Sequence, residues 1–556
     1  MNRFLKIFIR IFAGIASFLM LAVLLVVGLH ASVDLREPHF TPDSSPAEYS
    51  DSLRVWKDNY LKINPSGIME LRVSGSACER GEAIGKLIPD LLKAQEKAFV
   101  DKLYEMIPSA FYRRFLSYFI YIFNRDLGKN VPLEYRQEIK AMSEYCTHDY
   151  DDFGSPYERQ LQYHSAHDIG HVMQDYMLVG CTSFAVWGDR SADGELIAGR
   201  NFDFYMGEEF AGRNIVLVEK PDSGYAYISV VWPGMTGVVS GMNERGLTVS
   251  LNASKLETPK LSATPVSILA KQILQYAADI DDAVRIAGSV KTFVSESFLV
   301  CSASDGRAAV IEKTPSEMSV YDPACDNPEC NRVICTNHYQ SDVFKDRKEN
   351  VENLLESDSG FRFRRVEELL DSLGTINPET AALVLRDRRG VGGVNVGMCN
   401  ELSINQLLAM HSVIFKPCSG EIWVSAGPWQ CGVFQRFSLR EILDSGLPGI
   451  GRDSSEDIAA DPFILSPEFE QLKEFKRMSE KIRNAIASGT IIPKDSINRY
   501  ISLNPLYYNT YNIAGDYWQS TGDIETACEL WKKSLTFEVK PQERTAIENK
   551  VERYNR

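Results

Sequence analysis

The chain changes character at residue 181, and this change restricts its fold more than any other feature. After residue 181, short runs rich in Val, Ile, Phe and Tyr alternate with turn signals such as Ser-Ala-Asp-Gly-Glu at 191–195. Such runs predict antiparallel strands joined by hairpins. Helical patterns interrupt them around residues 265–290 and 362–373. Many strands with helices inserted as blocks predict an α+β fold, with helices packed on sheets.

The 556 residues are enough for two or three domains. Composition and pattern divide the chain into six segments: 1–30, a membrane anchor or signal segment; 31–65, a polar linker; 66–180, a mainly helical part; 181–440, the strand-rich part; 441–465, a second linker rich in Gly, Pro, Ser and Asp; and 466–556, a helical extension.

The helical extension contains one short pattern of small and large residues. Gly515, Trp518, Ala527, Trp531 and Ser534 follow the spacing of a tetratricopeptide helix pair. A single match is not an array, because a solenoid needs about three repeats. The pattern therefore fits two interpretations of the extension. One is a tetratricopeptide-like unit that binds a protein partner, and the other is a helical hairpin docked on the main domain.

The N-terminus predicts a membrane helix. Residues 11–29 carry no charge, and Arg3, Lys6 and Arg10 precede them. Nineteen residues at about 1.5 Å each nearly match a hydrocarbon core of about 30 Å, and the run is longer than the apolar part of most signal peptides. We expect an uncleaved anchor that contacts the membrane through residues 4–29, with a removed signal peptide as the alternative. The basic residues before the run then place the rest of the chain in the periplasm or outside the cell.

A second apolar run, residues 111–123, has helical periodicity. A buried helix is the commoner cause of such a run, and we expect one here, with a lipid-facing surface as the alternative. The net charge of −15 argues against binding to nucleic acid or to anionic membrane surfaces.

The eleven cysteines are open to disulfide formation in such a compartment. Three of them, Cys325, Cys330 and Cys335, are evenly spaced, but not at the spacing of structural zinc sites. We expect a loop disulfide or free thiols there, and neither a metal nor a cofactor.

The eight histidines offer two alternative chemistries. His164, His167 and His171 share one helix face and are typical zinc ligands, but no further ligand is evident. His338 and His411 are candidate bases for a Cys–His peptidase, and neither has a recognisable orienting partner in sequence.

A third chemistry needs no histidine. If the bond between Gly180 and Cys181 is cut, Cys181 becomes the first residue of a new chain. Its α-amino group, with a pKa near 7.7–8.0, then suits a general base at neutral pH, and its thiolate is the nucleophile. This mechanism predicts a cation near the thiol, a carboxylate beside the amine and side-chain amides that stabilise an oxyanion.

Cys181, its strand, its hairpin and the motif Gly-Arg-Asn-Phe-Asp at 199–203 resemble the start of the mature chain in N-terminal-nucleophile (Ntn) hydrolases. These include the choloylglycine (bile salt) hydrolases and the acyl-CoA:6-aminopenicillanic-acid acyltransferases, with acid ceramidase more distant. The upstream segment LRVSGSACERGEAIGKLI, with Gly75, Gly81 and Gly85, is similar to the acyltransferase branch. The resemblance covers roughly residues 66–440.

The resemblance implies roles for particular residues. Arg200 contacts the thiolate, and Asp203 contacts the new amino terminus. Asn252, in GMNERGLTVSLNAS, and Asn337, in ICTNHY, stabilise the oxyanion. In SGFRFRRVEELL, Arg362 is the better match for a late active-site arginine, with Arg365 one turn on.

The resemblance also implies a four-layer αββα sandwich and a self-cleaving cysteine amidohydrolase. Such an enzyme hydrolyses a linear amide bond of a small acyl-amide substrate through an acyl-thioester. The segment before Cys181 is longer than in the choloylglycine hydrolases, so activity would require the cut. The alternatives are an acyltransferase that passes the acyl group to an amine, and a membrane-tethered scaffold that binds partners through its C-terminal helices.

Overall fold

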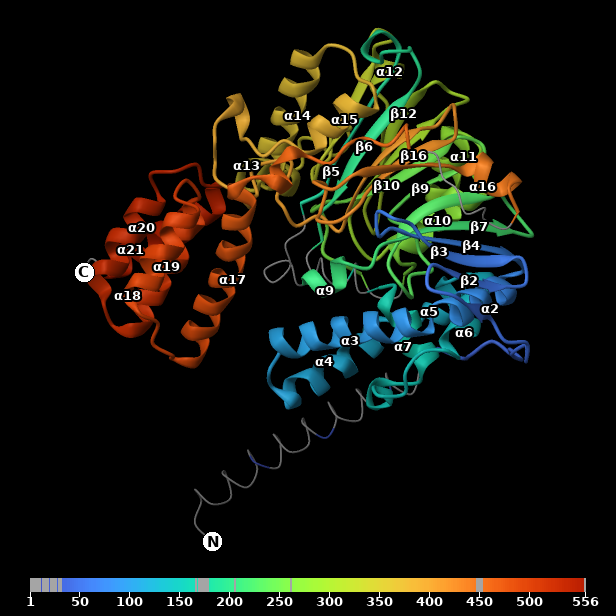
Figure 1. Cartoon of the computed structure of the whole chain (residues 1–556), viewed down its shortest axis with the longest axis horizontal. Helices are drawn as coiled ribbons and strands as arrows, with labels where there is room; N and C mark the ends of the chain where they lie inside the picture. The colour runs from blue at the N-terminus through green and yellow to red at the C-terminus, as the bar shows by residue number, and fades with distance from the viewer. Residues whose placement is uncertain are drawn as a thin grey trace.

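The computed structural model describes residues 33–165, 168, 180–204, 207–260, 263–446 and 454–554, and the single residues 12, 20 and 28. In this part of the chain, two β-sheets lie face to face and helices cover both outer faces (Figure 1). The predicted membrane segment, residues 4–29, lies outside the described residues apart from three single positions. Within the described residues, no helix combines the length and the hydrophobicity needed to cross a bilayer.

Eleven strands form the larger sheet, in the order β1 (Glu48–Tyr49), β2 (Leu53–Trp56), β3 (Asn59–Ile63), β4 (Met69–Gly75), β7 (Ile215–Pro221), β8 (Tyr227–Val231), β9 (Ser240–Asn243), β10 (Leu247–Ala253), β11 (Glu296–Ser302), β12 (Arg307–Lys313) and β13 (Met318–Tyr321). Neighbouring strands are antiparallel except β4 and β7, which are parallel.

Six strands form the smaller sheet, in the order β14 (Arg332–Cys335), β5 (Thr182–Val186), β6 (Ile197–Phe202), β15 (His411–Lys416), β16 (Glu421–Ser425) and β17 (Phe434–Ser438). All of its pairs are antiparallel.

The alternation of side chains along the strands builds the layers. In β7, Val216 and Val218 pack between the two sheets with residues of the smaller sheet such as Val424. Their neighbours Ile215 and Leu217 point to the opposite face and join the cluster beneath the helices. The larger sheet is covered by α2 (Ala77–Leu87), α6 (Leu133–Ser143), α10 (Val266–Tyr276) and α11 (Ile280–Ser289), and the smaller sheet by α14 (Ser359–Leu373) and α15 (Pro378–Leu385). The predicted α+β sandwich is confirmed.

The other helices of the sandwich region are α3 (Pro89–Met106), α4 (Ala110–Phe123), α5 (Leu127–Asn130), α7 (Pro156–Tyr163), α9 (Glu208–Ala211), α12 (Pro323–Asp326), α13 (Lys348–Glu356) and α16 (Leu439–Asp444), with 3-10 turns η1 (Asp151–Phe153), η2 (Gly188–Arg190), η3 (Val391–Gly393) and η4 (Pro462–Leu465).

The C-terminal extension is helical, as predicted. It consists of α17 (Pro467–Ser488), α18 (Lys494–Leu503), α19 (Tyr508–Thr521), α20 (Ile524–Ser534) and α21 (Pro541–Tyr554), which share their own apolar cluster. Gly515 allows α19 and α20 to pack closely, because a Cβ there would lie 2.5 Å from the Trp531 ring nitrogen.

Residues 48–63 are not a linker, and this part of the prediction is wrong. They form β1, β2 and β3 at the edge of the larger sheet, with Trp56 and Leu61 buried. These strands have only 2, 4 and 5 residues and lie between polar turns, so the composition of the segment is similar to that of a linker.

The expectation of a buried helix at 111–123 is also wrong. In α4, Phe111 is 84% exposed, Phe115 58% and Phe119 49%, and Phe123 is the buried aromatic residue of the helix. Periodicity marks an apolar face but does not say what covers it.

All eleven cysteines are free, so Cys325, Cys330 and Cys335 are unpaired thiols rather than a loop disulfide.

Two of the glycines in the upstream motif allow α2 to lie directly on its neighbours. A Cβ at Gly81 would lie 2.1 Å from the backbone oxygen of Glu138 in α6, and one at Gly85 would lie 2.2 Å from the ring of Tyr145. Neither contact allows a side chain unless a neighbour moves.

We expect Gly81→Ala to lower the free energy of unfolding by about 1–3 kcal/mol, because the atom it meets is backbone and cannot rotate away. Gly288→Ala is the control: it lies in α11 and would meet only the Met318 methyl group, at 3.4 Å. Its effect should be neutral or stabilising by up to about 1 kcal/mol. Urea unfolding followed by tryptophan fluorescence measures both, and equal losses would contradict the packing explanation.

Candidate active site

The hairpin of β5 and β6 builds the centre of the site. The strands pair with Thr182 opposite Asn201 and Ser183 opposite Arg200, so Cys181, just before β5, lies next to the end of β6. The Cys181 side chain is 1% exposed. Its Sγ lies 3.8 Å from Nη2 of Arg200 and 3.9 Å from the backbone oxygen of Asp203. The hairpin therefore brings the predicted nucleophile, cation and carboxylate residue together.

Arg200 is buried and its guanidinium reaches the larger sheet. It donates hydrogen bonds to the backbone oxygens of Val239 and Leu251 and to the hydroxyl of Ser240. It also stacks 4.6 Å above the centre of the Phe202 ring. Burial lowers the pKa of Arg200, and the neighbouring Cys181 thiol opposes that shift.

Two opposing effects act on the pKa of the Cys181 thiol. Burial raises its pKa, and the positive charge of Arg200 lowers it again in part. In the uncut chain burial is the larger effect, so the pKa of the thiol lies above its ordinary value.

The Asp203 carboxyl lies in the same buried space. Oδ2 accepts a hydrogen bond from Nε2 of Gln406 at 3.3 Å, and Oδ1 has no hydrogen-bond partner among the described residues. Burial raises the pKa of Asp203 to about 7, although Arg362 and Arg200 oppose the shift.

Arg362, in the first turn of α14, holds Cys181 from the other side. Its Nη1 donates to the backbone oxygen of Cys181 at 2.5 Å, and its Nη2 donates to Oδ1 of Asn337 at 2.6 Å. Arg365 pairs instead with Asp387 at 2.8 Å, away from Cys181. Of the two arginines that the sequence offered, Arg362 is therefore the one that reaches the site.

The two predicted oxyanion residues lie at the edge of this cluster. Asn252, on β10, donates from Nδ2 to the backbone oxygen of Cys335 at 3.0 Å and accepts from the Ser183 hydroxyl at 2.7 Å. Asn337 donates from Nδ2 to the backbone oxygen of Ala253 at 2.8 Å. Among the described residues each amide nitrogen donates one hydrogen bond, and an amide nitrogen carries two N–H groups.

Sequence reasoning missed Gln406. Its Nε2 lies 3.1 Å from the backbone oxygen of Gly180, the carbonyl of the bond predicted to be cut. The Gly180 nitrogen donates to the backbone oxygen of Asp203 at 3.2 Å. Gln406 is 2% exposed and lies in an irregular segment before β15, where no local pattern marks it.

The histidine alternatives gain no support from the described residues. His338 contacts the Ser359 hydroxyl at 2.8 Å, and Nε2 of His411 contacts the Ser240 hydroxyl at 2.8 Å. His164 uses both ring nitrogens on the backbone, contacting the Gln160 oxygen at 2.7 Å and the Thr236 nitrogen at 2.9 Å. His167 and His171 lie outside the described residues.

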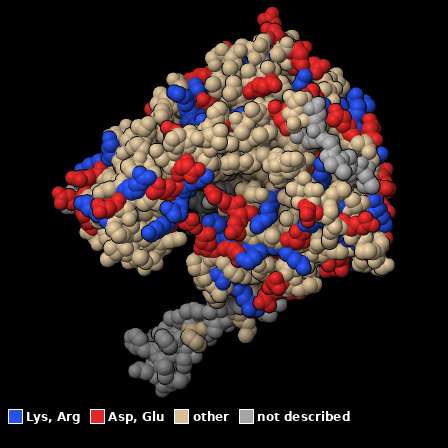
Figure 2. All heavy atoms as spheres, viewed as in Figure 1, with Lys and Arg blue, Asp and Glu red and all other residues tan. Residues whose placement is uncertain are grey.

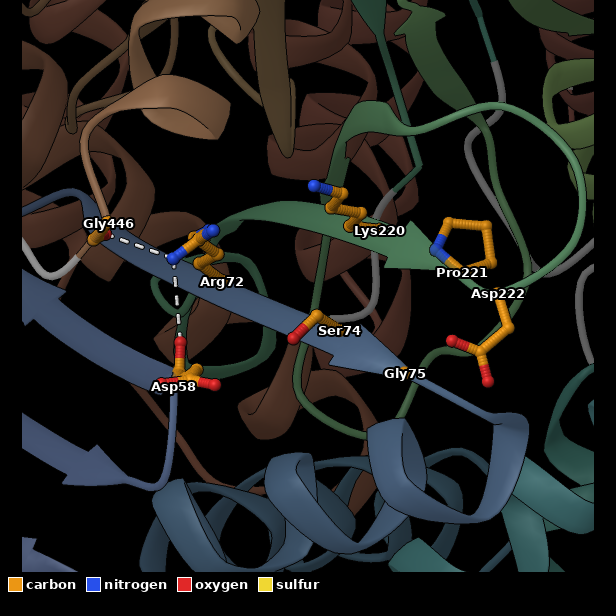
Figure 3. Close-up of a pocket in the computed structure, with 8 residues that line it drawn as sticks. All are labelled: Asp58, Arg72, Ser74, Gly75, Lys220, Pro221, Asp222 and Gly446. Carbon is orange, nitrogen blue, oxygen red and sulfur yellow. Dashed lines mark hydrogen bonds between the residues drawn. The ribbon is translucent and has the colours of Figure 1, made fainter.

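A cavity of about 580 Å³ lies elsewhere, beside the ends of β4 and β7 (Figure 3). Arg72 crosses it and donates to the backbone oxygens of Asp58 and Gly446, at 3.5 Å and 3.0 Å. None of its eight lining residues is a nucleophilic thiol or one of the residues around Cys181. The cavity is therefore not our candidate active site.

One known family matches the central part of the chain. The family model for acyl-coenzyme A:6-aminopenicillanic acid acyltransferase matches residues 190–427, which include all the predicted site residues except Cys181 and its neighbour Gly180. The predicted resemblance to the Ntn hydrolases is confirmed.

An uncharacterized protein of Archaeoglobus fulgidus is 28% identical over 209 residues, which are 34% of this chain and 34% of that protein. The chain thus spans about a third of the length of this curated relative.

Two solved structures align with part of the chain. The N-acylethanolamine-hydrolyzing acid amidase ortholog of Caenorhabditis elegans is 18% identical, with a TM-score of 0.32 over 43% of this chain and 93% of that one. A mutant conjugated bile acid hydrolase of Clostridium perfringens is 14% identical, with a TM-score of 0.30 over 44% and 89%. At these scores neither structure informs the substrate or the mechanism of this chain.

The raised pKa of Asp203 predicts a pH dependence of stability. Unfolding returns the carboxyl to its ordinary pKa of 3.8, from about 7 in the folded chain. The stabilisation by the proton is therefore full below about pH 3.8 and is lost as the pH rises through 7. In the Cys181→Ala chain, which lacks the predicted nucleophile, we expect stability to fall between pH 5 and pH 8.

Asp203→Asn in the same Cys181→Ala background isolates this effect, since other buried carboxyls remain in both chains. Urea midpoints at pH 5, 6, 7 and 8 measure it. The fall should be smaller in the double variant, and parallel curves for the two chains would contradict the assignment.

Proposed function

We propose that the chain is a self-cleaving cysteine Ntn hydrolase that acts on a linear amide bond of a small acyl-amide substrate. One observation carries the proposal: the Cys181 thiol lies 3.8 Å from the buried Arg200 guanidinium and directly follows Gly180 in an uncut chain. A cation at this distance favours a thiolate nucleophile.

Self-cleavage begins when Sγ of Cys181 attacks the carbonyl carbon of Gly180. The thiol proton passes to the nitrogen of Cys181 as the peptide C–N bond breaks. The product is a thioester between Gly180 and the Cys181 sulfur, together with a free α-amine. Water then hydrolyses the thioester, which leaves a Gly180 carboxyl group and the free thiol.

In turnover the new α-amine is the general base. It accepts the Cys181 proton while Sγ attacks the substrate carbonyl, and it later protonates the leaving amine. The remaining N–H groups of Asn252 and Asn337 stabilise the oxyanion, and loss of such a donor typically raises the barrier by about 2.7–4 kcal/mol. Water resolves the acyl-thioester.

There are two alternatives to this proposal. The matching family is named for an acyltransferase, so transfer to an amine acceptor is the second candidate. A non-enzymatic scaffold that recruits a protein partner through α17–α21 is the third, and it predicts an uncut chain. Nucleic acid is a poor partner for any of them: the net charge is −15, and acidic and basic side chains are interspersed on the face in Figure 2.

N-terminal sequencing and intact mass of the purified protein test the proposal. We expect a new chain that begins Cys-Thr-Ser-Phe-Ala at residue 181, and we expect it to be absent from Cys181→Ala. An uncut wild-type chain would remove the α-amine base, and the scaffold would then be the better explanation.

The location of the enzyme is part of the proposal: a tether through residues 4–29 holds it at a membrane, with the sandwich in the periplasm or outside the cell. The exposed aromatic face of α4, formed by Phe111, Phe115 and Phe119, supports it. Asp34, five residues after the apolar run, is fixed at the end of α4: its nitrogen donates to the Arg125 oxygen at 2.9 Å. A chain that leaves the bilayer here places the helix, about 21 Å long, at the lipid surface.

Brominated lipid tests this contact in the full-length chain reconstituted into phosphatidylcholine vesicles. The fluorescence added by Phe115→Trp should be quenched at least about twofold, because its side chain lies among acyl chains. Leu355→Trp is the matched control, since Leu355 is 62% exposed on α13, which lies far from α4 in Figure 1. Equal quenching at the two positions, or none at residue 115, would contradict the membrane contact.

A further inference from the structure

We propose that Gln406 is a catalytic residue of self-cleavage, whose side-chain amide stabilises the oxyanion that forms on Gly180. The inference deepens the proposed function and rests on it. It assigns the oxyanion of self-cleavage to Gln406 and the oxyanion of turnover to Asn252 and Asn337.

The position of the amide supports this role. Nε2 of Gln406 lies 3.1 Å from the Gly180 oxygen and 3.3 Å from Oδ2 of Asp203. One amide nitrogen carries two N–H groups, so it serves both acceptors at once. The carboxyl of Asp203 thus keeps the amide oriented, and the second N–H points at the carbonyl that Sγ attacks.

The two asparagines do not occupy this position in the uncut chain. Asn252 donates to the Cys335 oxygen and Asn337 to the Ala253 oxygen, at 3.0 Å and 2.8 Å. Over the part of the chain that the structure describes, Gln406 is the side chain that donates to the Gly180 oxygen.

The backbone around Gln406 is held in place, as an oxyanion donor requires. The neighbouring Leu407 has a φ of +56°, a conformation that leucine rarely adopts. Its oxygen accepts a hydrogen bond from Lys476 of α17 at 2.8 Å, and its nitrogen donates to Asn405 at 2.9 Å. Such strain persists only where the surroundings enforce it, and it is common at functional sites.

The same contact explains why residue 180 is glycine. A Cβ at this position would lie 2.4 Å from Nε2 of Gln406, closer than real side chains approach. Any other residue would displace the amide from the carbonyl. The absence of a side chain at residue 180 therefore leaves the space that the Gln406 amide occupies.

Pulse-labelled synthesis of the full chain in vitro, followed by gel analysis of the cut, tests the role. Gln406→Leu keeps a similar volume and removes both donors, so self-cleavage should slow by about 10²–10³-fold. Gln430→Leu is the matched control, because Gln430 is fully buried and its side chain makes no hydrogen bond with the described residues. It should cleave at the wild-type rate.

Gln406→Glu separates a donor from a structural support. Only a protonated carboxyl can donate to the Gly180 oxygen, so the rate relative to wild type should recover as the pH is lowered, and Gln406→Leu should show no recovery. Hydroxylamine, which cleaves thioesters, should not restore the cut in Gln406→Leu, because the missing step precedes the thioester.

The outcomes distinguish this inference from the proposed function. An uncut wild-type chain would reject self-cleavage itself. A cut wild type with Gln406→Leu within about threefold of its rate would overturn the role of Gln406 alone. Equal slowing by Gln406→Leu and Gln430→Leu would also overturn it, since any loss of core packing would then suffice.

Discussion

The site depends on the hydrogen bonds of the Arg200 guanidinium, because they connect the two sheets beside Cys181. The guanidinium extends from β6 of the smaller sheet and donates to the backbone oxygens of Val239 and Leu251 in and beside the larger one. Moving such a cation out of water costs several kcal/mol. The carbonyls and the Phe202 ring offset part of that cost. The positive charge of Arg200 therefore favours the thiolate form of Cys181, against the larger effect of burial.

The sequence predicted the parts of the site that local structure controls. The turn at 191–195 sets the register of the hairpin, and the register alone brings Arg200 and Asp203 to Cys181. The distant residues are a different case. Asn337 and Arg362 lie more than 150 positions from Cys181 and were assigned by resemblance, since no spacing rule connects a loop and a helix to a hairpin in another part of the chain. The structure brings them together, while their roles stay predictions.

What the sequence did not reveal depends on tertiary contacts. Gln406 has no motif around it, and its importance follows from the 3.1 Å contact with Gly180, 226 positions away. The same limit applies to α4. Phe115 and Phe119 have the periodicity of a core helix, and only the packed structure shows that nothing from the described residues covers that face. Strands β1–β3 were missed because such short strands and a polar linker differ in hydrogen bonding, not in composition.

If the chain cuts itself as proposed, the electrostatics of the uncut chain explain why the cut and the chemistry would share one place. Burial raises the pKa values of both the Cys181 thiol and the Asp203 carboxyl. In the uncut chain both groups therefore stay neutral up to a higher pH than they would in an exposed site. In the proposed mechanism, cleavage would add an α-amine, which would gain a proton and a positive charge in the same space. That charge favours ionisation of Asp203 and of the thiol. A cut anywhere else would leave the amine too far away to do so, because such effects require an opposite charge within about 4–6 Å. In the proposed mechanism the scissile bond must therefore adjoin the nucleophile, and Gln406, which would control the cut, would also control when the site acquires its base.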